Sequence, residues 1–248
     1  MRSIDLNCDM GEGCPHDAEL MKYVSSANIA CGFHAGDAAT MSRTVAAALE
    51  NSVSIGAHPG YPDRENFGRT DMLLPIFAIQ RMVGEQILAL IDICTAHGTK
   101  VTHVKPHGAL YNSSARDPEL AAAIAECIRD IDPGLVLYGL SGSVSITEAE
   151  NAGLKTAAEV FADRTYSPDG SLTSRSIRGA LITDPEIAAR QALALATNGE
   201  IAATNGSILR LAADTICIHG DGEHALRFAA AIHSGLLNHN IRILPLNG

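Results

Sequence analysis

The chain has 248 residues, of which 46% are hydrophobic and 19% are charged. This length suits one large α/β barrel or two small domains, and the composition is ordinary for a water-soluble globular protein. With a formal net charge of −10 and no cluster of lysines and arginines, the sequence lacks the basic surface that nucleic acids require. No apolar run approaches the roughly 18 residues of a membrane span, so neither nucleic acid nor membrane is expected as a partner.

The first segment favours a cytoplasmic location. Asp5 and Asp9 stand where a secretory signal peptide would have its apolar centre. The six cysteines form no C-x-x-C pair and no zinc-finger spacing. We therefore predict a cytoplasmic protein whose thiols are reduced.

Residues 3–9 predict a β-strand with one hydrophobic and one polar face. Apolar side chains at positions 4, 6 and 8 alternate with Asp5, Asn7 and Asp9. The pattern breaks at Gly11, and a helix is predicted at 17–24. A simpler interpretation of Asp9 is also open, because aspartate often bonds nearby backbone in a turn.

Two further strands are predicted to end in histidine. Residues 27–34 alternate polar and apolar side chains up to His34, and residues 53–58 do so up to His58. Between them, residues 38–50 predict an alanine-rich helix with Asp37 at its N-terminal cap. A polar face that ends in histidine therefore recurs along the chain.

A third segment, residues 101–111, places a lysine between two histidines. His103, Lys105 and His107 share one face of this β-type run, which ends at a proline and a glycine. The alternative is an exposed edge strand with a solvated lysine, since lysine is almost never fully buried without a partner. The recurrence of the polar faces favours a functional cluster.

The remaining segments continue the alternation of strands and helices. Long loops rich in glycine, proline and charge are predicted at 59–71 and 165–179, and such loops are usually functional. The other predicted strands are 135–140, 155–164, 215–220 and a closing run at 241–244. The other predicted helices are 76–97, 118–130, 145–151, 185–197 and 223–237.

This order of elements predicts βα units and a mostly parallel sheet. Open parallel sheets are covered by helices on both faces, so their strands are apolar throughout. Strands with one polar face instead favour a closed (β/α) barrel, whose polar lumen would form a site at the C-terminal ends of the strands. The alternative is a doubly wound open sheet. No linker is evident, and we predict one domain over 1–248.

The predicted strand ends and adjoining loops bring acid, base and cationic groups to this site: Asp9, His34, His58, Arg69, Lys105, His107, Glu159, Asp163, Arg164 and His219. Imidazoles can move protons, carboxylates can orient water, and cations can stabilise charge on oxygen or phosphate. A divalent metal is possible but is not predicted to be required. The spacing of His103 and His107 is too long for a chelate within a strand. No phosphate-binding loop with a lysine is present.

Seven segments, in order, closely resemble the LamB/YcsF family: DLNCDMGEG (5–13), NIACGFHAGD (28–37), GAHPGYPD (56–63), FGR (67–69), VKPHGALYN (104–112), EVFADRTY (159–166) and CIHGD (217–221). The resemblance runs through nearly the whole chain. It implies an irregular, seven-stranded (β/α) barrel related to the glycoside hydrolase/deacetylase superfamily. It also implies the role of that family, which is the A subunit of the prokaryotic ATP-dependent 5-oxoprolinase.

The implied reaction is the hydrolytic opening of 5-oxo-L-proline to L-glutamate, coupled to ATP hydrolysis. The resemblance implies two partner subunits, through which ATP would act as co-substrate. On this hypothesis the catalytic residues are Asp9, His34, His58, Lys105, His107 and His219. The expected substrate-binding residues are Asn7, Asp37, Asp63, Arg69, Glu159, Asp163 and Arg164.

Two alternatives remain open at this point. The chain could be a non-catalytic subunit that binds the lactam for its partners, or a stand-alone metal-dependent amide hydrolase that acts on an acetylated sugar. Loss of turnover on removal of Lys105, with assembly intact, would distinguish the first. A metal content assay would distinguish the second.

Overall fold

The computed structural model describes residues 2–219 and 225–246, and seven parallel strands in it close into a barrel. In barrel order these strands are β1 (Ser3–Met10), β2 (Ser26–Ala30), β3 (Ser54–His58), β4 (His103–Val104), β5 (Val136–Leu140), β6 (Lys155–Phe161) and β9 (Thr215–Ile218). Because β9 pairs with both β6 and β1, the sheet has no open edge at this point. The predicted seven-stranded barrel is confirmed, and the open-sheet alternative is wrong.

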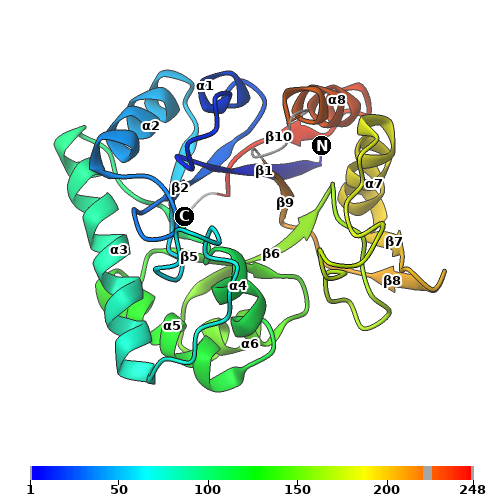
Figure 1. Ribbon diagram of the computed structural model, residues 1–248. Coiled ribbons are helices and arrows are strands. Elements are labelled where there is room, and N and C mark those ends of the chain that lie inside the picture. The colour runs from blue at the N-terminus through cyan, green and yellow to red at the C-terminus, as the bar shows by residue number, and fades with distance from the viewer. Residues whose placement is uncertain (1, 220–224, 247–248) are drawn as a thin grey trace.

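Helices surround the barrel (Figure 1). They are α1 (Asp17–Leu20), α2 (Ala38–Glu50), α3 (Ile76–Ala96), α4 (Gly108–Ser114), α5 (Pro118–Ile131), α6 (Val144–Asn151), α7 (Pro185–Asn198) and α8 (Ala225–Asn238). The predicted start of the last helix, at 223, lies outside the described residues. Among the described residues, no helix is both long enough and apolar enough to cross a membrane.

Three short strands lie outside the barrel. β10 (Arg242–Ile243) pairs in parallel with the start of β1. β7 (Glu200–Ala202) and β8 (Ile208–Arg210) form an antiparallel hairpin that the sequence did not predict.

The two faces of each barrel strand have different surroundings, as the alternation predicted. On β1, Leu6 and Cys8 join the hydrophobic core with Ile29, Val104 and Ile216 from neighbouring strands, and all five are fully buried. The polar side chains of the same strands form hydrogen bonds with one another inside the barrel. Burial of the apolar face stabilises the barrel, and the polar face is free to carry chemistry.

Strand β4, which leads to Lys105, is shorter than predicted. β4 ends at Val104, and Pro106 has no N–H for a sheet ladder. The chain nevertheless stays beside β3, because Lys105 N donates to Ala57 O at 2.9 Å and His107 N donates to Pro59 O at 2.8 Å. Helix α4, which was not predicted, then begins at Gly108.

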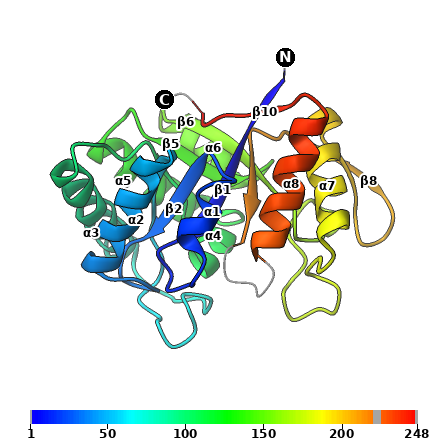
Figure 2. The same ribbon diagram turned by 90° about the horizontal axis from the view of Figure 1, so that it is seen from above.

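The loops that follow β3 and β6 extend from the same end of the barrel, opposite the N-terminus of β1 (Figure 2). In parallel barrels this is the C-terminal end of the strands, where sites are built from such loops. The fold therefore directs the search for a site to this end.

Candidate active site

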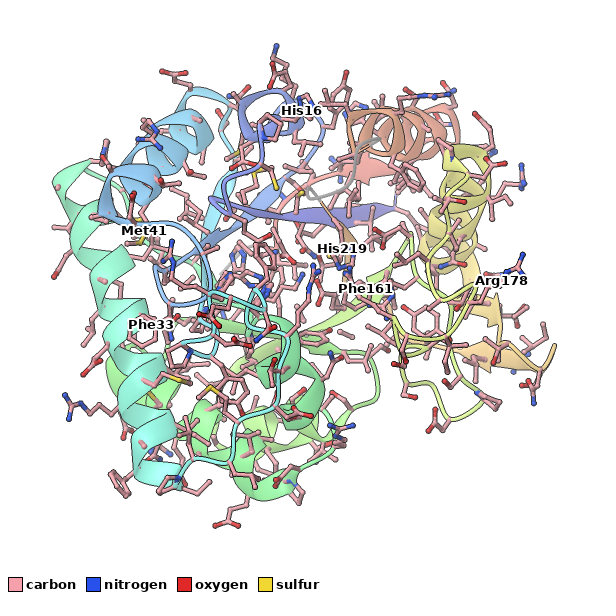
Figure 3. All side chains as sticks on the ribbon, viewed as in Figure 1. His16, Phe33, Met41, Phe161, Arg178 and His219 are labelled. Carbon is pink, nitrogen blue, oxygen red and sulfur yellow. The ribbon has the colours of Figure 1, made fainter. Side chains whose placement is uncertain are left out.

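A pocket of about 590 Å³ opens at the C-terminal end of the barrel. The predicted site residues that line it are Asp9, His58, Arg69, Lys105, His107, Arg164 and His219. Figure 3 places His219 and Phe161 near the centre of the molecule and Arg178 at its periphery. Asn7, His34, Glu159 and Asp163 are not lining residues, but their side chains contact those that are.

Lys105 is the central cation of the pocket floor. Its side chain is 2% exposed, and Nζ lies 2.9 Å from Asp9 Oδ1 and 2.8 Å from Glu159 Oε1. Nζ also donates to Asn7 Oδ1 at 3.2 Å and to Cys217 Sγ at 3.1 Å. Burial alone would lower the pKa of Lys105, but these neighbours outweigh it and raise the pKa well above its usual value. Lys105 is therefore a fixed positive charge.

Asp9 is the carboxylate that faces this cation. Its Oδ1 accepts from Asn28 Nδ2 at 2.8 Å, and its Oδ2 lies 3.4 Å from His58 Nε2. Burial would raise the pKa of Asp9, but His58 and Lys105 lower it well below the usual range. Asp9 therefore stays ionised, and the pocket floor holds a charged pair.

A carboxylate and three buried histidines form one wall. Glu12 Oε1 lies 3.2 Å from His34 Nε2, 3.3 Å from His107 Nδ1 and 3.8 Å from His58 Nε2. The rings of His34 and His107 stack with their centroids 3.8 Å apart. Burial, followed by the charge of His58, lowers the pKa of His34 to about 3 and that of His107 well below its usual value. At neutral pH these two imidazoles are uncharged ligands or bases.

A second carboxylate–histidine pair lies just beyond the ends of β6 and β9. His219 Nδ1 lies 2.8 Å from Asp163 Oδ2, and the His219 ring stacks on Phe161. Burial would raise the pKa of Asp163, but His219 holds it below the usual range. A neutral His219 must donate from Nδ1 to this carboxylate, which leaves Nε2 as a proton acceptor.

Four arginines, Arg69, Arg116, Arg164 and Arg175, line the mouth of the pocket together with Asp71 and Asp169, and Arg116 lies 3.4 Å from Asp71. The arginines outnumber the aspartates and give the mouth an excess of positive charge. Arg164 is 6% exposed and donates from Nη2 to Thr173 O at 2.6 Å. Burial and then the charge of Arg175 lower the pKa of Arg164. Such a mouth attracts an anion, phosphate above all.

The match to known proteins covers the residues that build this pocket. The model of the LamB/YcsF family matches residues 4–248. The chain belongs to the LamB/YcsF family. A relative from Erwinia tasmaniensis, named as the A subunit of 5-oxoprolinase, is 54% identical over 226 residues, which are 91% of this chain and 92% of the relative. A relative of the same name from Tolumonas auensis is 51% identical in an alignment of 248 positions that covers 98% of this chain and 99% of the relative.

Solved structures share the barrel. The crystal structure of a lactam utilization protein from Thermus thermophilus has a TM-score of 0.93 and 42% identity, and it covers 98% of this chain and 99% of that one. The peptidoglycan deacetylase PdaC from Bacillus subtilis, at 13% identity, has a TM-score of 0.51 over 99% of this chain and 88% of that one. This second likeness concerns the fold alone, and it agrees with the predicted relation to deacetylase barrels.

Two other residues that the sequence assigned to substrate binding, Asp37 and Asp63, lie outside the pocket of this LamB/YcsF member. Asp37 is exposed and caps α2, where its side chain accepts from Thr40 N at 2.7 Å. Asp63 organises its own loop, accepting from Asn66 Nδ2 at 2.8 Å and from Thr70 N at 3.3 Å. Their carboxylates satisfy local backbone and amide donors, so the structure gives both residues local roles.

Sequence reasoning missed Glu12, Tyr111 and Cys217 as site residues. Glu12 follows the end of β1, where strand alternation no longer says which way a side chain points. Tyr111 lies on the unpredicted helix α4, and burial and then the charge of Glu159 raise the pKa of its hydroxyl well above the usual value. Cys217 lies on the predicted strand 215–220, but only the three-dimensional contact with Lys105 reveals its place in the floor.

Proposed function

We propose that this chain is the A subunit of a 5-oxoprolinase and that it carries out the hydrolytic opening of 5-oxo-L-proline to L-glutamate. The two relatives with that name and the lactam utilization protein support the lactam as substrate. Because those relatives are subunits by name, they also support a complex, which we propose contains two partner subunits. ATP would act as co-substrate through these partners.

The observation that carries the proposal is the arrangement of charges around one pocket. A buried ammonium group, Lys105, lies on the floor, and the Asp163–His219 pair lies beside it on the wall. Hydrolysis of an amide needs a base for water, a cation for the developing oxyanion and an acid for the departing nitrogen. These three functions are available here from groups that are already held by hydrogen bonds.

The chemistry explains why ATP is needed. A five-membered lactam is stabilised by resonance and re-forms readily from glutamate, so attack by water alone is slow. Transfer of a phosphoryl group to the lactam oxygen, which we assign to the partners, makes the carbonyl carbon more electrophilic. The arginines at the mouth, with Arg69 and Arg164 predicted from the sequence, would hold the phosphoryl oxygens.

The steps that we assign to this chain start with His219. Its Nε2 takes a proton from water, the resulting hydroxide adds to the carbon that bears the phosphoryl oxygen, and the ring nitrogen takes that proton from His219. His219 then moves the remaining proton of the added hydroxyl to the nitrogen, while Lys105 stabilises the oxygen that this leaves negative. The carbon–nitrogen bond breaks as this oxygen becomes the carbonyl of an acyl phosphate. A second water releases inorganic phosphate from the acyl phosphate that remains. Asp163 holds the His219 ring in the required tautomer throughout.

Reconstitution with the two partner subunits tests this assignment. ADP and glutamate are measured separately for His219→Gln and Asp163→Asn, with exposed His239→Gln as a matched control. We expect glutamate formation to fall by about a hundredfold or more in the two pocket variants, because general acid–base catalysis contributes about that much. ADP formation should continue.

A different outcome would favour the non-catalytic alternative. If both variants released glutamate at the rate of the control, the chain would bind the lactam for its partners without taking part in the reaction. If the isolated chain opened the lactam with ATP and no partner, the proposed division of labour would be wrong.

A further inference from the structure

One wall of the pocket contains the carboxylate of Glu12 and the imidazoles of His34, His58 and His107. The proposed ring opening does not use these side chains. Backbone carbonyls fix the protonation of two of these imidazoles. His58 Nδ1 lies 2.7 Å from Lys105 O, and His107 Nε2 lies 2.8 Å from Phe67 O. A carbonyl oxygen only accepts hydrogen bonds, so both of these ring nitrogens carry the proton.

The other two ring nitrogens face each other. His58 Nε2 and His107 Nδ1 are 2.8 Å apart. Two carboxylates add acceptors, since Glu12 Oε1 lies 3.3 Å from His107 Nδ1 and Asp9 Oδ2 lies 3.4 Å from His58 Nε2. Glu12, His34, His58 and His107 each direct one possible ligand atom to this point, and these atoms all lie within 4.8 Å of one another.

We propose that Glu12, His58 and His107 bind one divalent metal ion of the zinc type. Their ligand atoms are separated by 2.8, 3.3 and 3.8 Å. Ligands at about 2.0–2.2 Å from a tetrahedral zinc ion are about 3.3–3.6 Å apart, so only small adjustments are needed. Imidazole nitrogens held by carbonyl oxygens on the far side of the ring are the usual zinc ligands.

The fourth position of this site faces the pocket, because Glu12, His58 and His107 all line it. Three protein ligands and one open position are the arrangement of catalytic rather than structural zinc. A water molecule bound there would lie next to Asp9, which can accept its proton. This inference does not rest on the proposed function, since metal binding is measured without substrate or partners.

His34 is a positioning residue rather than a ligand. Its ring stacks on that of His107, with an angle of 2° between the planes, so it packs against a ligand ring. Its Nε2 lies 3.2 Å from Glu12 Oε1 and can donate to it. His34 thus orients the carboxylate ligand and supports the His107 ring.

Two alternatives to this metal site are less well supported. A proton between His58 Nε2 and His107 Nδ1 accounts only for their distance of 2.8 Å, whereas a metal ion also accounts for Glu12 Oε1, which lies 3.8 and 3.3 Å from the same two atoms. A second group of possible ligands, Asp9, Cys217 and His219, lies nearby. The ammonium of Lys105 already binds Asp9 and Cys217, at 2.9 and 3.1 Å, and opposes a second cation there.

Binding of Co²⁺ and Zn²⁺ to the chelator-treated full chain tests the site. We expect one equivalent of Co²⁺ with the visible absorption of tetrahedral cobalt, displaced by Zn²⁺. His58→Gln and His107→Gln should abolish this spectrum, and Glu12→Gln should weaken binding strongly. His34→Gln should weaken binding by about 10- to 100-fold and keep the spectrum, as loss of a group that supports a ligand does.

His219→Gln is the control, because it removes a pocket histidine from the other possible group. It should bind the metal as the wild type does. The inference is overturned if the wild type, whose folding is not in question, binds no stoichiometric metal, or if His219→Gln loses the spectrum while His58→Gln and His107→Gln keep it. Either result leaves the reconstitution test of lactam opening unaffected, so the two proposals fail separately.

Discussion

Asp5 and Asp9 lie on the same face of β1, four residues apart, and their carboxylates behave in opposite ways. Asp5 is fully buried and accepts hydrogen bonds from the hydroxyls of Ser25, Thr215 and Tyr138, at 2.6, 2.6 and 3.0 Å. Burial, which the hydroxyls only partly offset, raises the pKa of Asp5. Asp9 has a lowered pKa, because it faces Lys105 and His58.

The difference shows that the strand fixes the direction of a side chain and its neighbours fix its chemistry. Around Asp5, nearer the N-terminal end of β1, the hydrogen-bond donors are neutral hydroxyls, and we call this the lower layer. Around Asp9, nearer the C-terminal end, the neighbours are cations that keep the carboxylate ionised beside the pocket, and we call this the upper layer. The following predictions test this contrast between the lower and the upper layer.

The largest effect is expected from removal of the cation. In Lys105→Met, Asp9 and Glu159 lose their counter-ion inside the barrel. Breaking a buried ion pair on one side typically costs about 3–5 kcal/mol, and loss of a group that stabilises the oxyanion typically lowers the rate about a hundredfold or more. Urea unfolding and reconstituted turnover measure the two effects.

Exposed Lys155 provides the matched control for this change. Lys155→Met should leave both stability and turnover close to those of the wild type. If Lys105→Met were equally mild, Lys105 would not be the cation that organises the upper layer.

The second prediction separates the two aspartates directly. Asp9→Asn should suppress lactam opening while the protein stays folded, because the amide keeps the shape but loses the charge. Asp5→Asn should keep turnover and lower the free energy of unfolding by about 1–3 kcal/mol, since an amide cannot accept all the hydroxyl bonds. Turnover and urea unfolding of both variants are compared. The contrast fails if both variants change the same property.

The third prediction concerns pH. The pKa of Asp5 is higher in the folded than in the unfolded state. Asp5 therefore stabilises the fold fully at a pH below its unfolded-state pKa of about 3.9, and this stabilisation is lost as pH rises through its folded-state pKa. The pKa of Asp163 is lower in the folded state, so Asp163 stabilises the fold at a pH above its unfolded-state pKa. That stabilisation is lost as pH falls through its folded-state pKa. The difference in unfolding free energy between wild type and Asp5→Asn should therefore fall with rising pH.

The corresponding difference for Asp163→Asn should rise with pH over the acid range. Unfolding in urea between about pH 2.5 and 7 measures both slopes, and one unit of pKa shift corresponds to about 1.4 kcal/mol. Slopes of the same sign would show that hydroxyl and cationic surroundings do not separate these carboxylates.

The sequence predicted the barrel because the alternation on β1 and its neighbours is strict. It predicted the inward direction of Asn7, Asp9 and Lys105 for the same reason, since side chains in a strand alternate by two. His34 was predicted as the end of a strand, but β2 ends at Ala30 and a loop places His34. This loop brings His34 Nε2 to 3.2 Å from Glu12 Oε1, next to the pocket.

The rest of the site depends on turns and on contacts between distant segments. Glu12 follows Gly11, whose positive φ of 73° turns the chain out of the strand. Gly108, with φ of 54°, starts α4 where a Cβ would lie 2.6 Å from Gly68 O, so a residue that usually breaks helices begins one here. Arg116 and Arg175 reach the pocket from separate loops, and no spacing in the sequence relates them.

The smallest effect is expected at Asp37, a carboxylate outside both layers. Its side chain accepts from Thr40 N at the start of α2, and this bond, with that from the Thr40 side chain, lowers its pKa. Asparagine caps a helix about as well as aspartate, and alanine does not. Asp37→Ala should therefore lower the melting temperature slightly, Asp37→Asn should restore it, and turnover should stay unchanged in both. If instead both variants raised the KM for 5-oxoproline while the melting temperature of Asp37→Asn stayed normal, the charge of Asp37 would contact the substrate, as the sequence alone had predicted.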